Sequence, residues 1–263
     1  MSILLVDIGN TRAKCAVLHG TRLSAPRALP HRAGAAGLAA LVQSAPRNIQ
    51  RVVAVCVMGA RYERALAAAV RARFGLRTEF IRSTRAAAGV RNGYRDTWRL
   101  GADRWVGVIA AHALARGRPA LVVNIGTALT VDAVTGDGRH LGGAIVPGPN
   151  TMIESLLAGT HGIRRRAQGA RAMKNGAQGE RRRGSRARAL FAADTASALD
   201  AGAAFAAAAF IDRSLAESRR VLGGRPLLLL SGGAAPALQP YIKSRVRRVP
   251  DLVLRGLAVL ARG

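Results

Sequence analysis

Short apolar runs recur along the chain, and turn-forming or charged residues separate them. Runs of this length and composition predict buried β-strands. Between several of them the apolar positions recur at the spacing of an amphipathic α-helix, as in residues 61–74, where arginines occupy the opposite face. The pattern predicts strands at residues 3–7, 13–18, 52–57, 78–81, 120–124, 128–134, 140–146 and 226–231.

Helices are predicted by periodicity and by their first residues. In "GGAIVPGPNTM" a strand ends and a proline falls in the first turn of a helix, where proline is favoured. Asp194 or the neighbouring Thr195 can cap the start of a long alanine-rich helix. The stretch 82–101 lacks periodicity and is expected to be irregular. The other helices are expected at residues 34–43, 61–74, 102–115 and 252–261.

Strands and helices alternate in both halves of the chain, and Gly117 and Pro119 interrupt the pattern near its middle. This alternation predicts an α/β protein with mixed sheets and helices outside them. A chain of 263 residues is long enough for one large domain or two smaller ones. We expect two, comprising residues 1–117 and 118–263.

The composition changes this picture little. Hydrophobic residues make up 49% of the chain and aromatic residues only 4%, which fits alanine-rich helices packed on aliphatic strands. No apolar run reaches the ~20 residues of a membrane span, and the first residues do not resemble a signal peptide. Cys15 and Cys56 form no spaced metal cluster and require no disulfide. A reducing cytoplasmic location is therefore expected.

The net charge of +27 is extreme, and much of it lies in the arginine-rich segment 162–190. Such a segment attracts polyanions whatever the fold. Nucleic-acid binding is one interpretation. The other, which we favour, is an arginine-biased composition with a solvated, loosely ordered segment, because no aromatic residue is available there to stack on bases.

Candidate chemistry begins with "LLVDIGNTRAK", residues 4–14. Gly9 permits a tight turn and a close approach of ligand to the backbone, while Asn10, Thr11 and Lys14 add polar and positive groups. Asp7 ends its strand where it can hold hydrated Mg²⁺, an ion that usually takes one or two carboxylates plus waters and phosphates. These features suit a phosphate-binding hairpin. A simple Asn-containing hairpin turn would have the same sequence.

A second copy of this phrase, "LVVNIGTALT", occupies residues 121–130. Gly126 and Thr127 repeat the backbone-plus-hydroxyl pairing, and Asp132 adds a carboxylate one strand later. Two such hairpins facing each other can grip the phosphates of one nucleotide. In "SGG" the pair Gly232 and Gly233 follows another buried strand, where an adenine can lie against bare backbone. No Walker phosphate-binding sequence is present.

The order of "DIGNTRAK", "NGYRDTWRLGADRW", "NIGTALTVD", "GGAIVPG", "DTASALDAG", "SGG" and "LVLRGL" closely resembles the type III pantothenate kinases, including their Bvg accessory factor-like members. The resemblance covers nearly the whole chain and is weakest at residues 160–192. It implies two ribonuclease H-like domains with a cleft between them, as in the superfamily of acetate kinase, sugar kinases, heat-shock chaperones and actin. It also implies ATP-dependent phosphorylation of pantothenate to 4′-phosphopantothenate, the first step of coenzyme A biosynthesis.

The resemblance assigns roles to individual residues. Asp103 matches the general base, which accepts the hydroxyl proton during phosphoryl transfer; without the resemblance, an Asp-Arg pair at a helix start would be the simpler interpretation. Thr195 also has helix capping as an alternative role. Substrate-binding positions are Tyr94, Gly101, Ala102, Asp103, Arg104 and Thr195. ATP-binding and phosphate-binding positions are Asp7, Ile8, Gly9, Asn10, Thr11, Arg12, Lys14, Gly126, Thr127, Gly232 and Gly233.

Asn124 departs from the family pattern, in which an aspartate at this position binds a monovalent cation such as K⁺ or NH₄⁺. Asparagine keeps a carbonyl oxygen but lacks the charge, so a weaker cation site, independence of the cation and loss of activity all stay open. We favour retained activity, since Asp7, Lys14 and Asp103 are all present. The family also implies ATP and Mg²⁺ as partners and an active site completed in a homodimer.

Two other hypotheses stay open besides a pantothenate kinase. The first is a regulatory or binding protein that keeps the fold, has a weak or lost kinase reaction and binds a polyanion through the basic segment. Its affinity for nucleic acid would fall steeply with salt. The second is a kinase of the same superfamily that acts on another small alcohol.

Overall fold

The computed structural model describes residues 1–30, 34–174 and 189–263. Its first sheet has the strand order β3-β2-β1-β5-β6, with β4 paired to β2. The central strand β1 runs antiparallel to β2 and parallel to β5. The strands are β1 (Ser2–Ile8), β2 (Arg12–His19), β3 (Arg22–Leu23), β4 (Arg27–Pro30), β5 (Arg51–Cys56) and β6 (Thr78–Phe80).

The second sheet repeats this plan with the order β11-β10-β9-β12-β13. Here β9 runs antiparallel to β10 and parallel to β12, so β9 corresponds to β1 and β10 to β2. A separate short hairpin joins β7 (Ala86–Ala87) to β8 (Val90–Arg91). The strands of the second sheet are β9 (Ala120–Ile125), β10 (Ala128–Val134), β11 (His140–Pro147), β12 (Leu227–Ser231) and β13 (Arg247–Arg248).

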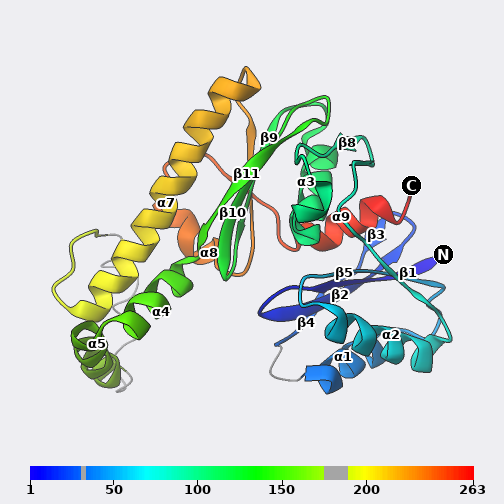
Figure 1. The fold of residues 1–263 in the computed structure, drawn as a ribbon, viewed down its shortest axis with the longest axis horizontal. Helices are drawn as coiled ribbons and strands as arrows, with labels where there is room; N and C mark the ends of the chain where they lie inside the picture. The colour runs from blue at the N-terminus through cyan, green and yellow to red at the C-terminus, as the bar shows by residue number, and fades with distance from the viewer. Residues whose placement is uncertain (31–33, 175–188) are drawn as a thin grey trace.

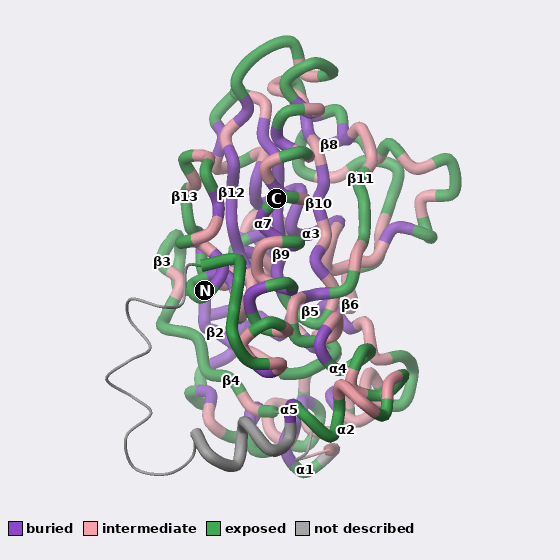
Figure 2. Tube along the Cα trace, turned by 90° about the vertical axis from the view of Figure 1, so that its left-hand side faces the viewer, coloured by how far each residue is buried: buried purple, intermediate pink, exposed green. Residues whose placement is uncertain are grey.

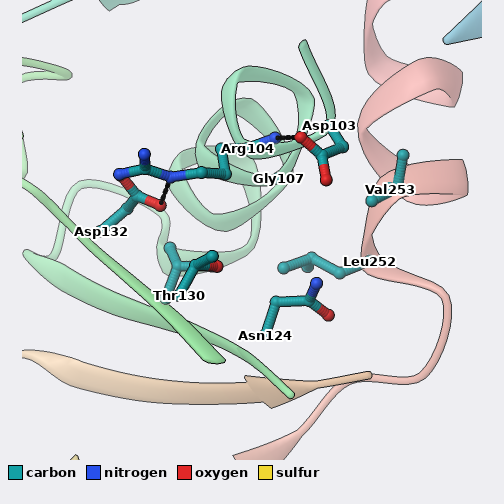
Figure 3. Close-up of a pocket in the computed structure, with 9 residues that line it drawn as sticks. Asp103, Arg104, Gly107, Asn124, Thr130, Asp132, Leu252 and Val253 are labelled. Carbon is teal, nitrogen blue, oxygen red and sulfur yellow. Dashed lines mark hydrogen bonds and ion pairs between the residues drawn. The ribbon is translucent and has the colours of Figure 1, made fainter. Parts of the chain in front are cut away.

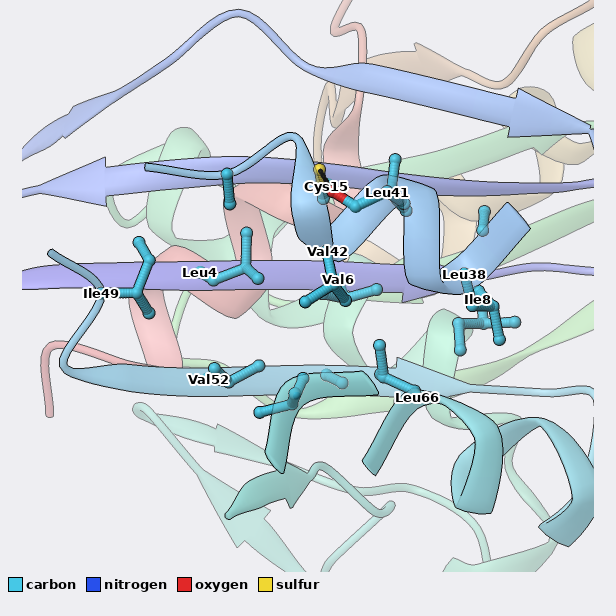
Figure 4. Close-up of a cluster of buried hydrophobic side chains, with 14 of the residues drawn as sticks. Leu4, Val6, Ile8, Cys15, Leu38, Leu41, Val42, Ile49, Val52 and Leu66 are labelled. Carbon is cyan, nitrogen blue, oxygen red and sulfur yellow. Dashed lines mark hydrogen bonds between the residues drawn. The ribbon is translucent and has the colours of Figure 1, made fainter. Parts of the chain in front are cut away.

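Helices cover both faces of the first sheet (Figure 1). On the outer face lie α1 (Gly34–Gln43) and α2 (Ala60–Phe74), whose Leu38 and Leu66 pack against apolar side chains of β1 such as Val6 (Figure 4). On the inner face, Leu254 and Leu257 pack against the alternate side chains of β1. Because β1 is buried on both faces, its sequence is a continuous apolar run rather than an alternating one.

Two helices, α3 (Ala102–Ala115) and α9 (Leu252–Leu260), lie between the sheets (Figure 1). Trp105 and Ile109 of α3 pack in the core of the second sheet, whereas Val106 faces the first sheet together with α9. The outer face of the second sheet is covered by α7 (Thr195–Leu222). Figure 2 shows that inner strands such as β12 are buried between these helical layers, whereas edge strands such as β13 are exposed.

Further short helices complete the described chain: η2 (Thr97–Arg99), α4 (Pro149–Gly159), α5 (His161–Lys174), α8 (Ala235–Leu238) and η3 (Gln239–Tyr241). No helix in the described part of the chain is long and apolar enough to span a membrane. The predicted division at residue 117 falls between α3 and β9, so each sheet lies on one side of it. The last helix nevertheless packs on the first sheet, and the division into 1–117 and 118–263 stays a prediction.

The predicted α/β class with mixed sheets is confirmed, and the principal strands lie within two residues of their expected bounds. The prediction that residues 162–190 are loosely ordered was partly wrong, since residues 161–174 form α5. Arginine and alanine are good helix formers, and Ala167 is buried. Residues 175–188 of that segment lie outside the described residues. Asp194, not Thr195, caps α7, since its Oδ1 accepts the Ser197 N–H at 2.9 Å.

Gly256 sets how closely α9 approaches α3. A Cβ at this position would lie 2.1 Å from the backbone oxygen of Val106, so Gly256→Ala must force the helices apart. We expect it to lower the free energy of unfolding by about 1–3 kcal/mol, measured by chemical denaturation. Gly202→Ala in α7 is the matched control, because its Cβ meets nothing within 4 Å and alanine should stabilise the helix by up to about 1 kcal/mol. Equal effects of both variants would contradict the close-contact argument.

Candidate active site

The two glycine turns that join β1 to β2 and β9 to β10 meet each other. In the first, the Gly9 N–H donates to Arg12 O at 3.2 Å, and in the second, the Gly126 N–H donates to Ala128 O at 3.0 Å. The hydroxyl oxygens of Thr11 and Thr127 lie 2.8 Å apart. The structure therefore brings together two segments that are more than a hundred residues apart in the sequence.

The residues around these turns are not equally accessible. Asn10, Thr11 and Arg12 are exposed. Ile8 is fully buried in the core of the first sheet, and its carbonyl accepts the Val57 N–H at 3.0 Å. Its side chain therefore serves packing, and any contribution of Ile8 to phosphate binding is indirect.

Asp7 lies beside Lys14, its partner across the β1–β2 hairpin. The Lys14 ammonium donates to Asp251 Oδ1 at 2.8 Å. Asp251 immediately precedes α9 and has a left-handed backbone, with φ +53°, a conformation that is uncommon for residues other than glycine. The hairpin of the first sheet is thereby joined to the start of the last helix.

The pKa of Asp7 is raised to about 7, mainly by burial and also by the charges of Asp103 and Asp251, against the opposing effect of Lys14. With Asp103 and Asp251, Asp7 forms a group of acidic side chains that a single ammonium, that of Lys14, does not balance, and such an excess of negative charge suits a cation. Among the described residues, no group of three or more His, Cys, Asp or Glu can hold an ion directly. The arrangement fits Mg²⁺ that keeps most of its waters and contacts the protein through Asp7.

Asp103 is the second residue of α3. Its Oδ1 accepts the backbone N–H of Arg104 at 2.8 Å, and burial raises the pKa of its carboxyl above the ordinary value. A Cβ at Gly101 would lie 2.8 Å from this oxygen. Gly101 therefore leaves the space that the carboxylate occupies, and Ala102 packs beside it against the inner core of the first sheet.

Arg104 is held by a buried ion pair. Its Nη2 and Nε donate to the two oxygens of Asp132 at 2.7 and 3.0 Å, and its Nη1 donates to the Tyr94 hydroxyl at 2.9 Å. Asp132, expected beside the nucleotide phosphates, instead serves as the partner of Arg104. Both side chains are more than 90% buried, and a bidentate pair of this kind fixes the guanidinium plane.

Asp103 and Arg104 face a pocket between α3, the second sheet and the start of α9 (Figure 3). Asn124 and Thr130, which are partners across the β9–β10 hairpin, line the same pocket with Leu252. Asn124 occupies in β9 the place that Asp7 occupies in β1. The second sheet thus has an amide at the position where the first sheet has a carboxylate.

The third glycine turn follows β12. Gly232 has φ +98°, and a Cβ there would lie 2.2 Å from the backbone oxygen of Ile125. Gly232 is therefore required for packing against β9, whereas Gly233 has open space around it. Gly233 is the residue of this turn that a flat ring can approach.

Thr195 is the first residue of α7, which contacts α5 and packs on the face of the second sheet opposite to α3 (Figure 1). Within one chain the structure does not bring Thr195 to Tyr94 and Asp103. It does bring Tyr94, Gly101, Asp103 and Arg104 together.

Sequence reasoning missed three residues of this site. Asp251 immediately precedes a helix, and in the sequence an aspartate at that position indicates only a helix cap. His140 donates from Nε2 to Asp132 Oδ1 at 3.0 Å, but it contacts Asp132 through an irregular pairing of β10 with β11 that no periodicity predicts. Gly143 lies opposite Asp132, and a Cβ there would lie 2.5 Å from Asp132 Oδ1.

A mixed sheet that occurs twice, with two glycine turns that meet, is the actin-like ATPase fold that the sequence predicted. Solved structures share the fold: a conserved Baf family protein from Campylobacter jejuni has a TM-score of 0.53 at 18% identity, with 98% of this chain and 97% of that chain covered. The ethanolamine utilization protein EutJ from Carboxydothermus hydrogenoformans has a TM-score of 0.55 at 14% identity, with 99% and 90% covered.

Sequence comparison identifies the family. The model of the type III pantothenate kinase family matches residues 3–217. The type III pantothenate kinase of Aromatoleum aromaticum is 40% identical over 99% of this chain and 98% of its own length. That of Nitrosococcus oceani is 33% identical over 99% and 94%, respectively. The chain belongs to the type III pantothenate kinase family.

The raised pKa of Asp7 predicts a pH-dependent stability. Because the folded state keeps a proton that the unfolded chain loses above its ordinary pKa of 3.8, the free energy of unfolding falls between about pH 4 and pH 7, by at most about 1.4 kcal/mol per pH unit. Asp7→Asn should remove this loss, so the variant should match the wild type near pH 4 and exceed it at pH 8.

Denaturation in buffer free of nucleotide and Mg²⁺ measures this difference. Asp200→Asn, at an exposed position of α7, is the control and should change stability little at either pH. A stability difference between Asp7→Asn and wild type that stays constant from pH 4 to pH 8 would contradict the raised pKa.

Proposed function

We propose that the protein transfers the γ-phosphoryl group of ATP to pantothenate and forms 4′-phosphopantothenate, the first step of coenzyme A biosynthesis. The observation that carries this proposal is the pair Asp103 and Arg104 at the start of α3, held in one pocket beside the two meeting glycine turns. Membership of the family indicates which reaction is catalysed. The arrangement of the side chains provides a proton acceptor and phosphate-binding groups for that reaction.

Asp103 is the group that accepts the proton from the attacking hydroxyl of pantothenate. Phosphoryl transfer demands positioning and charge neutralisation more than covalent chemistry, so a single well-placed base suffices. Burial raises the pKa of Asp103, which makes its carboxylate a better proton acceptor than an exposed aspartate.

The nucleotide phosphates are held by the turns at Gly9–Thr11 and Gly126–Thr127 together with Lys14. Mg²⁺, held through Asp7, neutralises phosphate charge when bound. Lys14 donates to Asp251 in the structure, so a phosphate would share this ammonium with Asp251 or take it over. Gly233 offers bare backbone for the adenine.

Arg104 is the group that recognises the pantothenate carboxylate. Its contacts with Asp132 and Tyr94 use three of the five guanidinium N–H groups. Within the described residues the remaining two, one on each terminal nitrogen, are available to a ligand at the pocket. An arginine held rigidly on one side is well suited to bind a carboxylate on another.

We also propose that the monovalent-cation site is weakened by Asn124. The amide oxygen can still coordinate a cation, but the charge of the family's aspartate is missing. Catalysis persists because Asp103, Arg104 and Asp7 do not depend on Asn124 for their contacts. Turnover should therefore be similar in K⁺ and in Na⁺ buffers.

A homodimer would complete the site. Thr195 begins α7, and α7 and α3 pack on opposite faces of the second sheet (Figure 1). Thr195 of a second copy is therefore the one that would contact pantothenate. Exposed apolar side chains support an interface on this part of the molecule: Ile145 of β11, Leu156 of α4 and Phe191 just before α7 are 60%, 45% and 90% exposed. Surfaces with several such residues mark interaction sites.

Replacement Asp103→Asn tests the reaction. The wild type should convert ATP to ADP in proportion to the pantothenate added and form 4′-phosphopantothenate, in both K⁺ and Na⁺ buffers. The variant should lose at least about a hundredfold in kcat while still binding ATP, because only the proton acceptor is removed. ADP release and ATP titration measure the two quantities. Near-normal turnover in the variant would contradict the assignment of Asp103, and no turnover in folded wild type would favour a binding protein or another alcohol as substrate.

Mixing two inactive variants tests the shared site. Asp103→Asn and Thr195→Val chains, unfolded together and refolded, should recover about a quarter of the wild-type activity, since half of the dimers are mixed and each contains one intact site. Refolding each variant alone is the control. A monomer in light scattering, or no recovery from the mixture, would contradict a site completed by the partner copy.

A further inference from the structure

We infer that His140 is a positioning residue that holds the substrate-binding Arg104 in place through Asp132 and Tyr94. The inference rests on the proposed function, in which Arg104 binds the pantothenate carboxylate. His140 is only 1% exposed and lies at the start of β11. It therefore acts on the substrate only through other side chains.

His140 provides a further hydrogen bond to the Asp132 carboxylate. Oδ1 of Asp132 accepts from both Arg104 Nη2, at 2.7 Å, and His140 Nε2, at 3.0 Å. A buried carboxylate is costly unless it is paired and fully hydrogen-bonded. The second donor keeps the Asp132 carboxylate in the orientation that engages Arg104 with both oxygens.

His140 also contacts the loop that carries Tyr94, through its ring and its Nδ1 atom. The two rings stack with centroids 6.0 Å apart and planes 10° from parallel. The Gly93 N–H makes a long hydrogen bond of 3.5 Å to His140 Nδ1, and a Cβ at Gly93 would lie 2.0 Å from the His140 backbone oxygen. The loop thus rests directly on His140, and Tyr94 is placed to accept from Arg104.

These contacts select one form of the imidazole. An Nδ1 that accepts from Gly93 leaves the proton on Nε2, where it is donated to Asp132. One ring therefore orients both groups that hold Arg104, the carboxylate by a hydrogen bond and the phenol by stacking. Gly143 contributes by having no side chain, since a Cβ there would lie 2.7 Å from Arg104 Nη2.

Two substitutions separate the donor from the ring. His140→Phe keeps an aromatic ring against Tyr94 but removes the donor to Asp132, whereas His140→Gln can restore a donor nitrogen near the position of Nε2. We expect His140→Phe to raise KM for pantothenate about tenfold, which corresponds to the loss of one hydrogen bond to a charged group. KM for ATP and kcat should change little, and His140→Gln should recover most of the pantothenate affinity.

His112→Phe is the matched control. His112 is a half-buried histidine of α3 that lies beside Gly89 and Gly138, and its replacement should leave both KM values unchanged. An unchanged KM for pantothenate in folded His140→Phe would overturn the inference.

A second readout does not require turnover. The Nε–H of Arg104 donates to Asp132, so its exchange with solvent, followed by NMR on ¹⁵N-labelled protein and assigned through Arg104→Lys, reports how firmly the guanidinium is held. His140→Phe should accelerate this exchange about tenfold, and His140→Gln should not. If wild-type protein did not phosphorylate pantothenate, the proposed function would fail, and the exchange rate alone would decide whether His140 positions Arg104.

Discussion

The close packing of α3 against α9 between the two sheets is the constraint on which the site depends. Gly256 allows α9 to touch the backbone of α3 at Val106, and each helix buries side chains against a different sheet as well as against its neighbour. Asp103 lies at the start of α3 and Asp251 immediately before α9. The apolar contact between the helices therefore sets where two of the three acidic side chains meet the hairpin that carries Asp7 and Lys14.

The site concentrates charge in two different ways. Asp132 and Arg104 neutralise each other in a buried bidentate pair, so this part of the site is rigid and electrically balanced. Asp7 lies within reach of the charges of Asp103, Asp251 and Lys14, and its pKa rises to about 7 as a result of burial and of its acidic neighbours. A balanced pair suits substrate positioning, whereas an unbalanced acidic group suits binding of a cation with its phosphates.

Much of the architecture could be predicted from local pattern. The apolar runs that became β1, β5, β9 and β12 are buried on both faces, and a continuous apolar run is what such strands require. Both glycine turns were predicted from the repeated Ile-Gly phrase, and both lie at the site. The helix α5 was missed because its charge was taken as a sign of disorder. The short edge strands β3, β4 and β13 were missed because each pairs with only one neighbour and carries little apolar signal.

By itself the sequence determined the order of elements, the repeat of the sheet, and the residue types at Asp103, Arg104 and the two turns, since each of these follows from local periodicity or from a short motif. Tertiary structure alone decided which side chains become partners. Asp132 pairs with Arg104 rather than facing phosphate, His140 reaches Asp132 through an irregular strand pairing, and Lys14 meets Asp251 across 237 residues of chain. The physical reason is that local sequence sets backbone conformation, whereas long-range partners are set by how helices and sheets pack.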